Sequence, residues 1–268
     1  MLREVPPGGG ELIGSTPDRR VELFCDHDAV HATWSRFGPG RPGADLHVHR
    51  RHSDLFYVLE GELVLLLGPR GTSVAVPAGT LVRIPPLVVH GFRAGAQGTR
   101  YLNLHAPGRG FAGFLRALRD GRDGAYDQEP PPADGGRPPE EAAIGGGEVV
   151  LDRPGLRVVL HAEIEELAVA EVELDAAGRA PAAHASRGHV VLLYVLEGEL
   201  TVTSGARDLR APSGTWLQLP DEVPYALAAA GGRPARFLAV HAPGRGAGAL
   251  VRALAGRDGD VTPPRRRG

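Results

Sequence analysis

The heptapeptide Tyr-Val-Leu-Glu-Gly-Glu-Leu occurs twice in this chain of 268 residues, at Tyr57–Leu63 and at Tyr194–Leu200. The two halves align beyond it with small insertions, so that His105 matches His241. Self-similarity at a fixed spacing indicates tandem copies of one structural unit. The chain is also long enough for two domains that each bury a core. We therefore expect two copies of one domain.

A segment rich in breakers of helix and strand separates the copies. Between residues 127 and 147, five Pro and five Gly fill ten of twenty-one positions, which is typical of a linker. The predicted organisation is an N-terminal domain over residues 1–126, a linker over 127–147, a C-terminal domain over 148–256 and a disordered tail over 257–268.

Short runs of β-branched and aliphatic residues, separated by Gly and Pro, predict an all-β fold. In the first copy the predicted strands are 30–37, 44–49, 55–59, 62–67, 73–76, 81–84 and 101–105. Glu60-Gly61 is a tight-turn signal and predicts a hairpin. After each Gly-Arg-Gly turn, apolar residues at helical spacing predict one helix, over 111–118 and 249–254. Many short strands imply a closed sandwich or barrel.

Charge and hydropathy exclude several classes of protein. The formal net charge of −2 gives no indication of a nucleic-acid partner. The longest aliphatic run, residues 63–67, is far too short to span a membrane, and the N-terminus has no apolar signal region. The single cysteine, Cys25, rules out an internal disulfide framework and is expected to be buried and inert. We expect a cytoplasmic protein with no membrane or nucleic-acid partner.

Potential metal ligands gather in the first copy. In a strand, residues i and i+2 point to the same side, so His47 and His49 project together. Asp54 begins the next strand, and His90 can arrive from a later neighbouring strand. Three imidazoles and a carboxylate suit one divalent first-row metal, Fe, Mn, Ni, Cu or Zn. For Asp54 two roles remain open, direct ligation and orientation of a histidine.

These residues resemble the two motifs of the cupin superfamily. His47-Val48-His49, Asp54 and Gly61 are similar to the first motif, in which HxH is followed by an acidic residue and a glycine. Pro77-Ala78-Gly79 and His90 are similar to the second motif, a PxG turn with a lone histidine. The chain departs from the pattern at Asp54, where the family usually has Glu. The resemblance implies a bicupin, with two tandem cupin barrels of the double-stranded β-helix or jelly-roll type, each followed by a short α-helix.

Resemblance to cupins of the quercetin-dioxygenase type implies a metal-dependent oxygenase. Its substrate would be a small organic molecule, aromatic or enolisable, bound in the first barrel, with Asp54 as catalytic base if it leaves the metal. A non-redox isomerase, cyclase or decarboxylase and a ligand-binding protein without catalysis are the alternatives. Strand alternation suggests pocket walls at Trp34, Phe56, Arg83, Phe92, Tyr101 and Asn103.

The second copy lacks these ligands. Ser186, Val191 and Tyr225 stand there in place of His49, Asp54 and His90. A serine, a valine and a tyrosine cannot rebuild the site, so we expect a metal-free scaffold, paired with the first barrel in a monomer or part of a homodimer. The alternative is a different site built from His184, His189 and a glutamate.

Two further histidines have counterparts in both copies. His105 and His241 are expected to make a shared structural hydrogen bond, because the copy without the other ligands keeps this histidine. His52, matched by His189, is expected to be structural or to lie beside the ligands without joining them.

Overall fold

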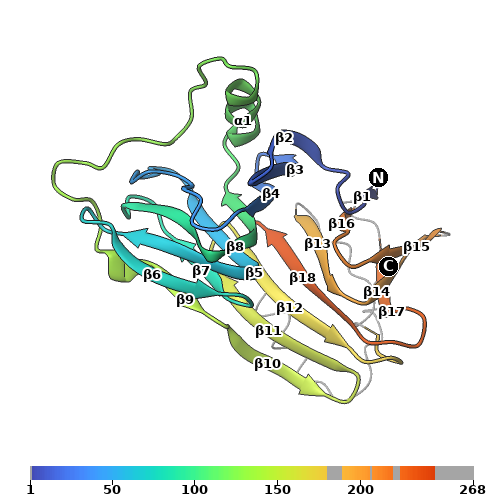
Figure 1. Ribbon diagram of the computed structural model, residues 1–268. Helices are drawn as coiled ribbons and strands as arrows, with labels where there is room; N and C mark the ends of the chain where they lie inside the picture. Colours follow the sequence, from blue (N-terminus) through green and yellow to red (C-terminus); the bar gives the residue numbers. More distant parts are fainter. Residues whose placement is uncertain (1, 180–188, 206, 220–223, 245–268) are drawn as a thin grey trace, which may run out of the picture. The chain divides into compact units, whose positions relative to one another are not determined.

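The computed structural model describes residues 2–179, 189–205, 207–219 and 224–244, which form two compact units built mostly of β-strands (Figure 1). The N-terminal unit is Gly8–Gly147, and the C-terminal unit combines Met1–Pro7 with Glu148–Gly268. The predicted all-β class is confirmed.

The N-terminal unit is an eight-stranded antiparallel sheet with one helix. Its sheet order is β2-β3-β4-β8-β5-β7-β9, and β6 pairs with β5. The elements are β2 (Glu11–Thr16), β3 (Arg19–His27), β4 (Val30–Phe37), β5 (Ser53–Leu67), β6 (Thr72–Pro77), β7 (Leu81–Ile84), β8 (His90–Ala106), α1 (Phe111–Arg119), the 3-10 turn η1 (Pro139–Glu141) and β9 (Ala143–Gly145).

The C-terminal unit contains a seven-stranded and a three-stranded sheet. Their orders are β1-β16-β13-β18-β12-β11-β10 and β15-β14-β17. The strands are β1 (Arg3–Val5), β10 (Glu148–Arg153), β11 (Leu156–Glu163), β12 (Ala168–Leu174), β13 (Val190–Glu197), β14 (Glu199–Ser204), β15 (Arg207–Pro212), β16 (Trp216–Leu219), β17 (Tyr225–Ala229) and β18 (Ala235–Ala242).

The two units share one strand order. The series β2-β3-β4-β8-β5-β7 of the first corresponds to β10-β11-β12-β18-β13-β16 of the second. Beyond it, a short flanking segment supplies the edge strand of each sheet, β9 beside β7 and β1 beside β16. Because β1 pairs with β16, the first seven residues belong to the C-terminal unit and not to the domain predicted over residues 1–126.

The segment predicted as a linker is part of the N-terminal unit. β9 pairs with β7, and the backbone of Val48 exchanges two hydrogen bonds with that of Glu129. Pro and Gly shape an ordered path here because backbone pairing with the sheet holds the segment in place. The predicted tail over 257–268 and the second predicted helix lie outside the described residues.

The first copy of the heptapeptide forms a bulge and not the predicted hairpin. β5 runs through Glu60 and Gly61 and pairs with β8 on both sides of them, with register shifts at this point. Gly61 has a φ of 68°, and a Cβ there would lie 2.2 Å from the carbonyl oxygen of Gly98. An extra residue at a bulge bends the strand. Gly61 therefore permits a close approach between β5 and β8. Glycine also occurs in hairpin turns, which is why the residue type alone predicts a hairpin here.

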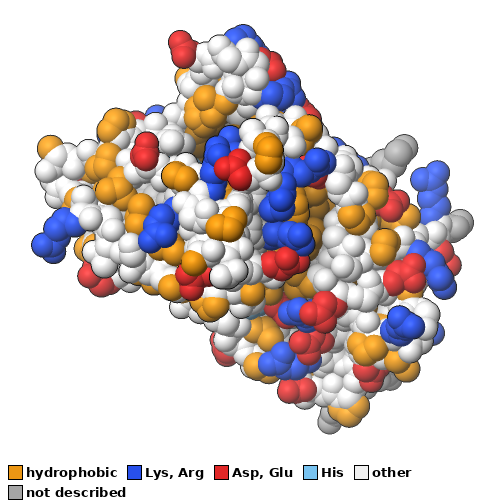
Figure 2. Space-filling view, viewed as in Figure 1, with side chains coloured by type: hydrophobic (Ala, Val, Ile, Leu, Met, Phe, Trp, Pro, Cys, Tyr) orange, Lys and Arg blue, Asp and Glu red, His pale blue; other side chains and the backbone are white. Residues whose placement is uncertain are grey.

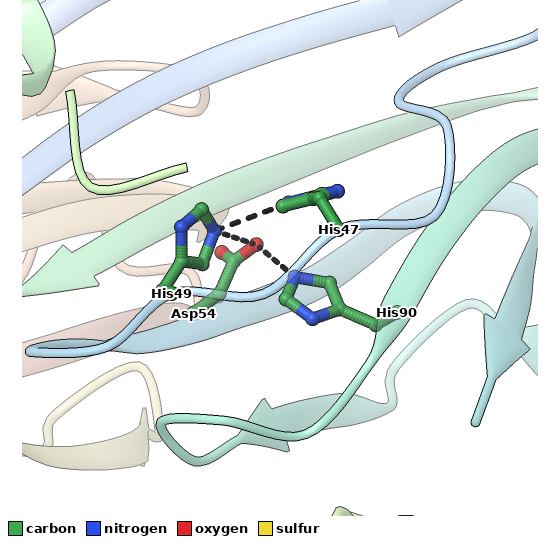
Figure 3. Close-up of side chains that lie close together, drawn as sticks. All are labelled: His47, His49, Asp54 and His90. Atoms are coloured by element: carbon green, nitrogen blue, oxygen red, sulfur yellow. Dashed lines mark hydrogen bonds and ion pairs between the residues drawn. The ribbon is translucent and has the colours of Figure 1, made fainter. Parts of the chain in front are cut away.

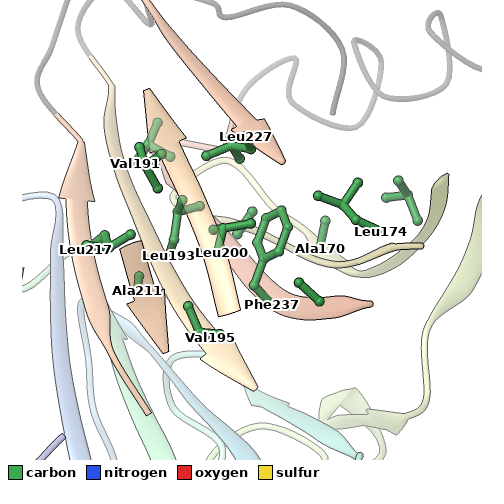
Figure 4. Packing of buried hydrophobic residues seen from close by; sticks show 14 of the residues in the cluster. Ala170, Leu174, Val191, Leu193, Val195, Leu200, Ala211, Leu217, Leu227 and Phe237 are labelled. Atoms are coloured by element: carbon green, nitrogen blue, oxygen red, sulfur yellow. The ribbon is translucent and has the colours of Figure 1, made fainter. Parts of the chain in front are cut away.

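Each unit has its own apolar core. In the C-terminal unit the buried cluster includes Val191, Leu193 and Phe237 (Figure 4). In the N-terminal unit it includes Phe56, Val58 and Leu65. Acidic and basic side chains are interspersed on the face shown in Figure 2. Among the described residues, no helix combines the length and the apolar character that a membrane crossing needs.

Candidate metal centre

The four predicted ligands converge inside the N-terminal unit (Figure 3). Asp54 is the second residue of the long strand β5, and His90 is the first residue of β8. His47 and His49 lie before β5, in a segment that forms single bridges and not the predicted strand over 44–49. His47 and His90 exchange two backbone hydrogen bonds of 2.8 and 2.9 Å. This bridge holds the HxH segment against the first residue of β8.

The ligand atoms lie within 4.8 Å of one another, and all four side chains are buried. The Nε2 atoms of His47 and His49 are 3.2 Å apart. Oδ2 of Asp54 lies 3.4 Å from Nε2 of His90 and 3.8 Å from Nε2 of His49. One oxygen and three ring nitrogens therefore face a common point.

Backbone carbonyls fix the tautomer of each ligand histidine. Nδ1 of His47 donates to the carbonyl of Asp45 at 2.7 Å, and Nδ1 of His90 donates to that of Val88 at 2.9 Å. Nδ1 of His49 donates to the carbonyl of Asp127 at 2.5 Å. Because a carbonyl only accepts, each Nδ1 carries the proton and each Nε2 presents a lone pair to the common point.

Electrostatics keep the donor set in its ligating form. Burial, followed by the neighbouring His90 and His49, lowers the pKa of His47 to about 3. Burial by itself raises the pKa of the Asp54 carboxyl, but His105, His49 and His90 hold that pKa well below its usual range. At neutral pH the imidazole is neutral and the carboxylate is ionised, which are the forms that bind metal.

This donor set fits a divalent transition metal. Nε2 of His90 is buried without a hydrogen bond, and Oδ2 of Asp54 lies 3.4 Å from it. Lone pairs that face one another across a buried point need a cation or a donor between them. Three imidazoles and a carboxylate are ligands that Fe, Mn, Ni, Cu and Zn accept.

The second oxygen of Asp54 is held by β8. Nδ2 of Asn103 donates to Oδ1 of Asp54 at 2.5 Å, and Nε2 of His105 lies 3.3 Å from the same oxygen. Nε2 of His105 donates to Oδ1 of Asn103 at 3.0 Å. Asn103, predicted as a pocket wall, therefore also sets the orientation of the carboxylate that faces the histidines.

A hydrogen-bonded series continues from His105 to the segment after α1. The hydroxyl of Tyr126 lies 2.7 Å from Nδ1 of His105 and 2.9 Å from Nε2 of His52. Nδ1 of His52 donates to a carboxylate oxygen of Asp127 at 3.0 Å. His49, His52 and His105 also lie close together, but these contacts occupy both nitrogens of His52 and His105. We assign no second metal position to that trio.

Asp127 joins the end of the HxH segment to the predicted linker. Its carboxylate accepts the backbone N–H of Arg50 at 2.9 Å and that of Arg51 at 2.7 Å, while its carbonyl accepts Nδ1 of His49. Carbonyl and carboxylate partners of ligand histidines fix ring orientation. The role of Asp127 could not be predicted from the sequence, because a carbonyl acceptor can come from any residue type and the composition of this segment is that of a linker.

A cavity of about 420 Å³ opens beside His47, His49 and Asp54. Of the predicted wall residues, Phe56, Phe92, Tyr101 and Asn103 line it. Trp34 and Arg83 do not, contrary to the prediction. Thr33, Ser35 and Phe37 of β4 line the cavity, so Trp34, with the opposite parity, faces away. Arg83 instead donates to the carbonyl of Glu141 at 3.4 Å.

The corresponding region of the C-terminal unit is apolar where it is described. Val191 is buried opposite His241 and Leu219, as Asp54 lies opposite His105 and Ile84 in the other unit. His184 and Ser186 lie outside the described residues. Among those that are described, both groups of three or more clustered potential ligands belong to the N-terminal unit.

Comparison with known sequences finds similarity to cupin domains within the N-terminal unit. The cupin-domain family model matches residues 33–104, a range that includes all four candidate ligands. The chain is 30% identical over 113 residues to quercetin 2,3-dioxygenase of Bacillus subtilis (strain 168). That alignment covers 42% of this chain and 33% of the relative, so it spans about a third of the relative's length.

Solved structures match both units. Oxalate decarboxylase from Bacillus subtilis aligns over 90% of this chain and 76% of its own, with a TM-score of 0.64 and 15% identity. The putative glyoxylate-induced protein from Pseudomonas aeruginosa aligns over 91% of this chain and 90% of its own, with a TM-score of 0.66 and 18% identity. At these identities the likeness establishes the fold. The predicted pair of cupin jelly-roll barrels is confirmed.

Proposed function

With a cupin domain in the N-terminal unit as the premise, we propose that this unit is a metal-dependent enzyme of the oxygenase type. His47, His49, Asp54 and His90 would hold one divalent transition metal. The observation that carries this proposal is the convergence of Nε2 lone pairs whose Nδ1 protons are all donated to backbone carbonyls. When bound, such a metal activates O₂ or polarises a substrate oxygen.

The residues around the ligands supply positioning and exclude water. Phe56, Phe92 and Tyr101 pack against one another along the cavity, with ring centroids 5.2 to 5.7 Å apart. Aromatic walls suit a small aromatic or enolisable substrate. Asn103 fixes Oδ1 of Asp54, which leaves Oδ2 for the metal or for a substrate proton. The similarity to a quercetin dioxygenase supports oxygenase chemistry.

A non-redox reaction at the same metal is the second candidate. The observation that favours it is the donor set itself, because three imidazoles and a carboxylate also suit Zn²⁺, which only acts as a Lewis acid. In that case the reaction is an isomerisation, cyclisation or decarboxylation.

Oxygen dependence separates the two candidates. Protein loaded with Fe, Mn, Ni, Cu or Zn is incubated with a panel of enolisable aromatic compounds that includes quercetin, and O₂ uptake and product formation are recorded. We expect O₂ uptake that needs a redox-active metal and is lost in His49→Ala. Turnover by the zinc-loaded protein in the absence of O₂ would contradict the oxygenase proposal and support the non-redox reaction.

A further inference from the structure

Arg19 is an arginine on the inward side of the N-terminal barrel. It begins β3, where Arg19 and Val21 line the cavity and Leu23 belongs to the apolar core. Side chains of the same parity along a strand point to the same face. An arginine on the core side of a sheet is unusual unless a carboxylate pairs with it.

No carboxylate of the described part of the chain pairs with Arg19. Its Nε is buried without a hydrogen bond. The neighbouring arginines differ, since Arg20 pairs with Glu22 at 2.5 Å and Arg41, at the edge of the same cavity, pairs with Asp18 at 2.5 Å. An unpaired guanidinium beside a cavity is therefore peculiar to Arg19 among these three arginines.

The surroundings hold the Arg19 guanidinium in place, and no described residue accepts a hydrogen bond from its Nε. The Cζ atom of Arg19 lies over the Phe37 ring, 5.6 Å from its centroid. Stacking on a ring fixes the guanidinium while leaving its N–H edge free to bind a planar anion. The positive charge of Arg19 also acts on Tyr101. Burial raises the pKa of the Tyr101 hydroxyl, whereas a hydrogen bond from Ser35 and, to a smaller extent, the charge of Arg19 lower it.

From these observations we propose that Arg19 binds a carboxylate of the substrate, and that the substrate is an aromatic acid. The guanidinium fork matches a carboxylate through two parallel hydrogen bonds. Arg19 offers one unpaired positive charge, which balances a carboxylate and not a doubly charged phosphate. The aromatic side chains of Phe37, Phe56, Phe92 and Tyr101 would contact the rings.

The register sets the size of this substrate. Arg19 lies opposite Phe37, whereas Asp54 and His31 both lie opposite His105. Phe37 and His31 are six residues apart on β4, which is about 20 Å along a strand. Even with a long arginine side chain, a molecule that meets both Arg19 and the metal ligands is larger than one ring. This inference rests on the proposed function, because it assigns the far end of the same cavity.

Binding of a charged and a neutral probe tests the assignment. The full-length protein is treated with chelator, so that a carboxylate cannot bind a metal, and titrated calorimetrically with 2-naphthoate and with 2-naphthamide. We expect the wild-type protein to bind naphthoate about tenfold more tightly than the amide. Arg19→Gln should bring the ratio close to one, and Arg19→Lys should keep part of the preference because it keeps the charge.

Arg36→Gln is the matched control. Arg36 lies on β4 with the parity opposite to the cavity-lining residues, and its guanidinium donates to the carbonyl of Pro17. This variant loses the same charge and should keep the full preference for naphthoate. Two results would overturn the assignment of Arg19 as the carboxylate-binding residue. One is a preference for naphthoate over the amide that survives in Arg19→Gln, and the other is the lack of saturable naphthoate binding by the wild type. Thermal unfolding checks that each variant is folded. If Arg19→Gln does not fold, the binding preference of Arg19→Lys tests the assignment instead.

Metal content of the untreated preparations separates this proposal from the proposed function. Protein that binds metal but shows no Arg19-dependent preference contradicts the aromatic-acid site alone. Protein that binds no metal but keeps the Arg19-dependent preference contradicts the metal enzyme and leaves the acid site standing.

Discussion

Asp54 and Val191 occupy the same place in two sheets of the same topology, yet one is a buried carboxylate and the other a buried aliphatic side chain. The difference extends to the strand opposite. Asn103 of β8 corresponds to Ala239 of β18, and these lie opposite Phe56 and Leu193. The cupin sheet thus forms around either filling, which means that the polar cluster is not needed for the fold.

The histidine shared by the units shows the same contrast. His105 is buried and His241 is partly buried, and burial lowers the pKa of each below its ordinary value. His105 donates to Asn103 beside Asp54, whereas Val191 and Ala239 offer no side-chain acceptor to His241. The contact that His105 makes with Asn103 therefore has no counterpart at Ala239. Buried polar groups are stabilising only when partnered, so the cluster in the N-terminal unit supports a role in chemistry.

Replacing a ligand in the N-terminal unit should have the largest effect. Binding of a metal by four protein ligands is worth roughly 10–16 kcal/mol at structural zinc sites, so the loss of one ligand removes about 3–4 kcal/mol or more. His49→Ala should therefore weaken metal binding by at least about 100-fold. Elemental analysis and competition with a chromogenic chelator measure the change.

His184→Ala is the control from the other copy and should leave the metal content unchanged. The reverse pattern, with metal lost in His184→Ala and kept in His49→Ala, would assign the metal to the C-terminal unit.

A carboxylate placed at the equivalent C-terminal position should destabilise that unit. Val191 is 2% exposed within an apolar cluster, and Val191→Asp would bury an acid opposite His241 but with Ala239 in place of the Asn that holds Asp54. We expect the free energy of unfolding to fall by about 3 kcal/mol. Urea denaturation measures it, with Val191→Thr as the control of nearly equal shape. An unchanged midpoint for Val191→Asp would show that polar partners are available there.

The parts of the fold that local sequence determines could be predicted. β4 and β7 have the predicted bounds, because each is a run of strand-forming residues ended by Gly or Pro. The first half of β8 was missed, since its Gly-rich residues have no apolar alternation and are extended only because they pair with β5. Glu60-Gly61 was assigned to a hairpin because a turn and a bulge use the same glycine.

The candidate site divides in the same way. His47, His49, Asp54 and His90 could be predicted because the chemistry is carried by their residue types at recognisable spacings. Asp127 and Tyr126 could not, since their roles depend on where a distant segment passes the HxH residues. Arg19 was missed because the inward parity of β3 becomes visible only when its pairing with β4 is known.

Weakening the Asp127 contacts should have an intermediate effect. Asp127→Asn keeps the carbonyl that accepts Nδ1 of His49 but replaces one of the two oxygens that accept Arg50 N, Arg51 N and His52 Nδ1. Partners that orient metal ligands are worth 10- to 100-fold in metal affinity, and we expect a loss of about tenfold. Chelator competition measures it.

Glu129→Gln is the matched control for that segment. Glu129 pairs with Arg50 at 2.6 Å with both side chains largely exposed, and exposed pairs contribute little. Its effect on metal affinity should be less than about twofold. Equal effects of the two variants would mean that the whole segment, and not the Asp127 carboxylate, supports the ligands.

The smallest predicted effect concerns His31, whose counterpart in the C-terminal unit is Ala168. Burial lowers the pKa of His31 to about 4 from 6.5, so the unfolded chain binds a proton at a higher pH than the folded chain does. The free energy of unfolding must then fall as the pH drops below 6.5, by up to about 1.4 kcal/mol per pH unit from this residue, and the fall must end near pH 4. His31→Asn can keep the hydrogen bond to the carbonyl of Cys25 but does not titrate.

Urea denaturation of the chelator-treated protein between pH 7.5 and pH 5 tests this sign. The free energy of unfolding of His31→Asn should fall less steeply with acid than that of the wild type, by roughly 1 kcal/mol per pH unit below pH 6. His27→Asn, which changes an exposed histidine at the end of β3, should follow the wild-type slope. Parallel curves for His31→Asn and the wild type would mean that His31 takes up its proton equally in the folded and unfolded chains.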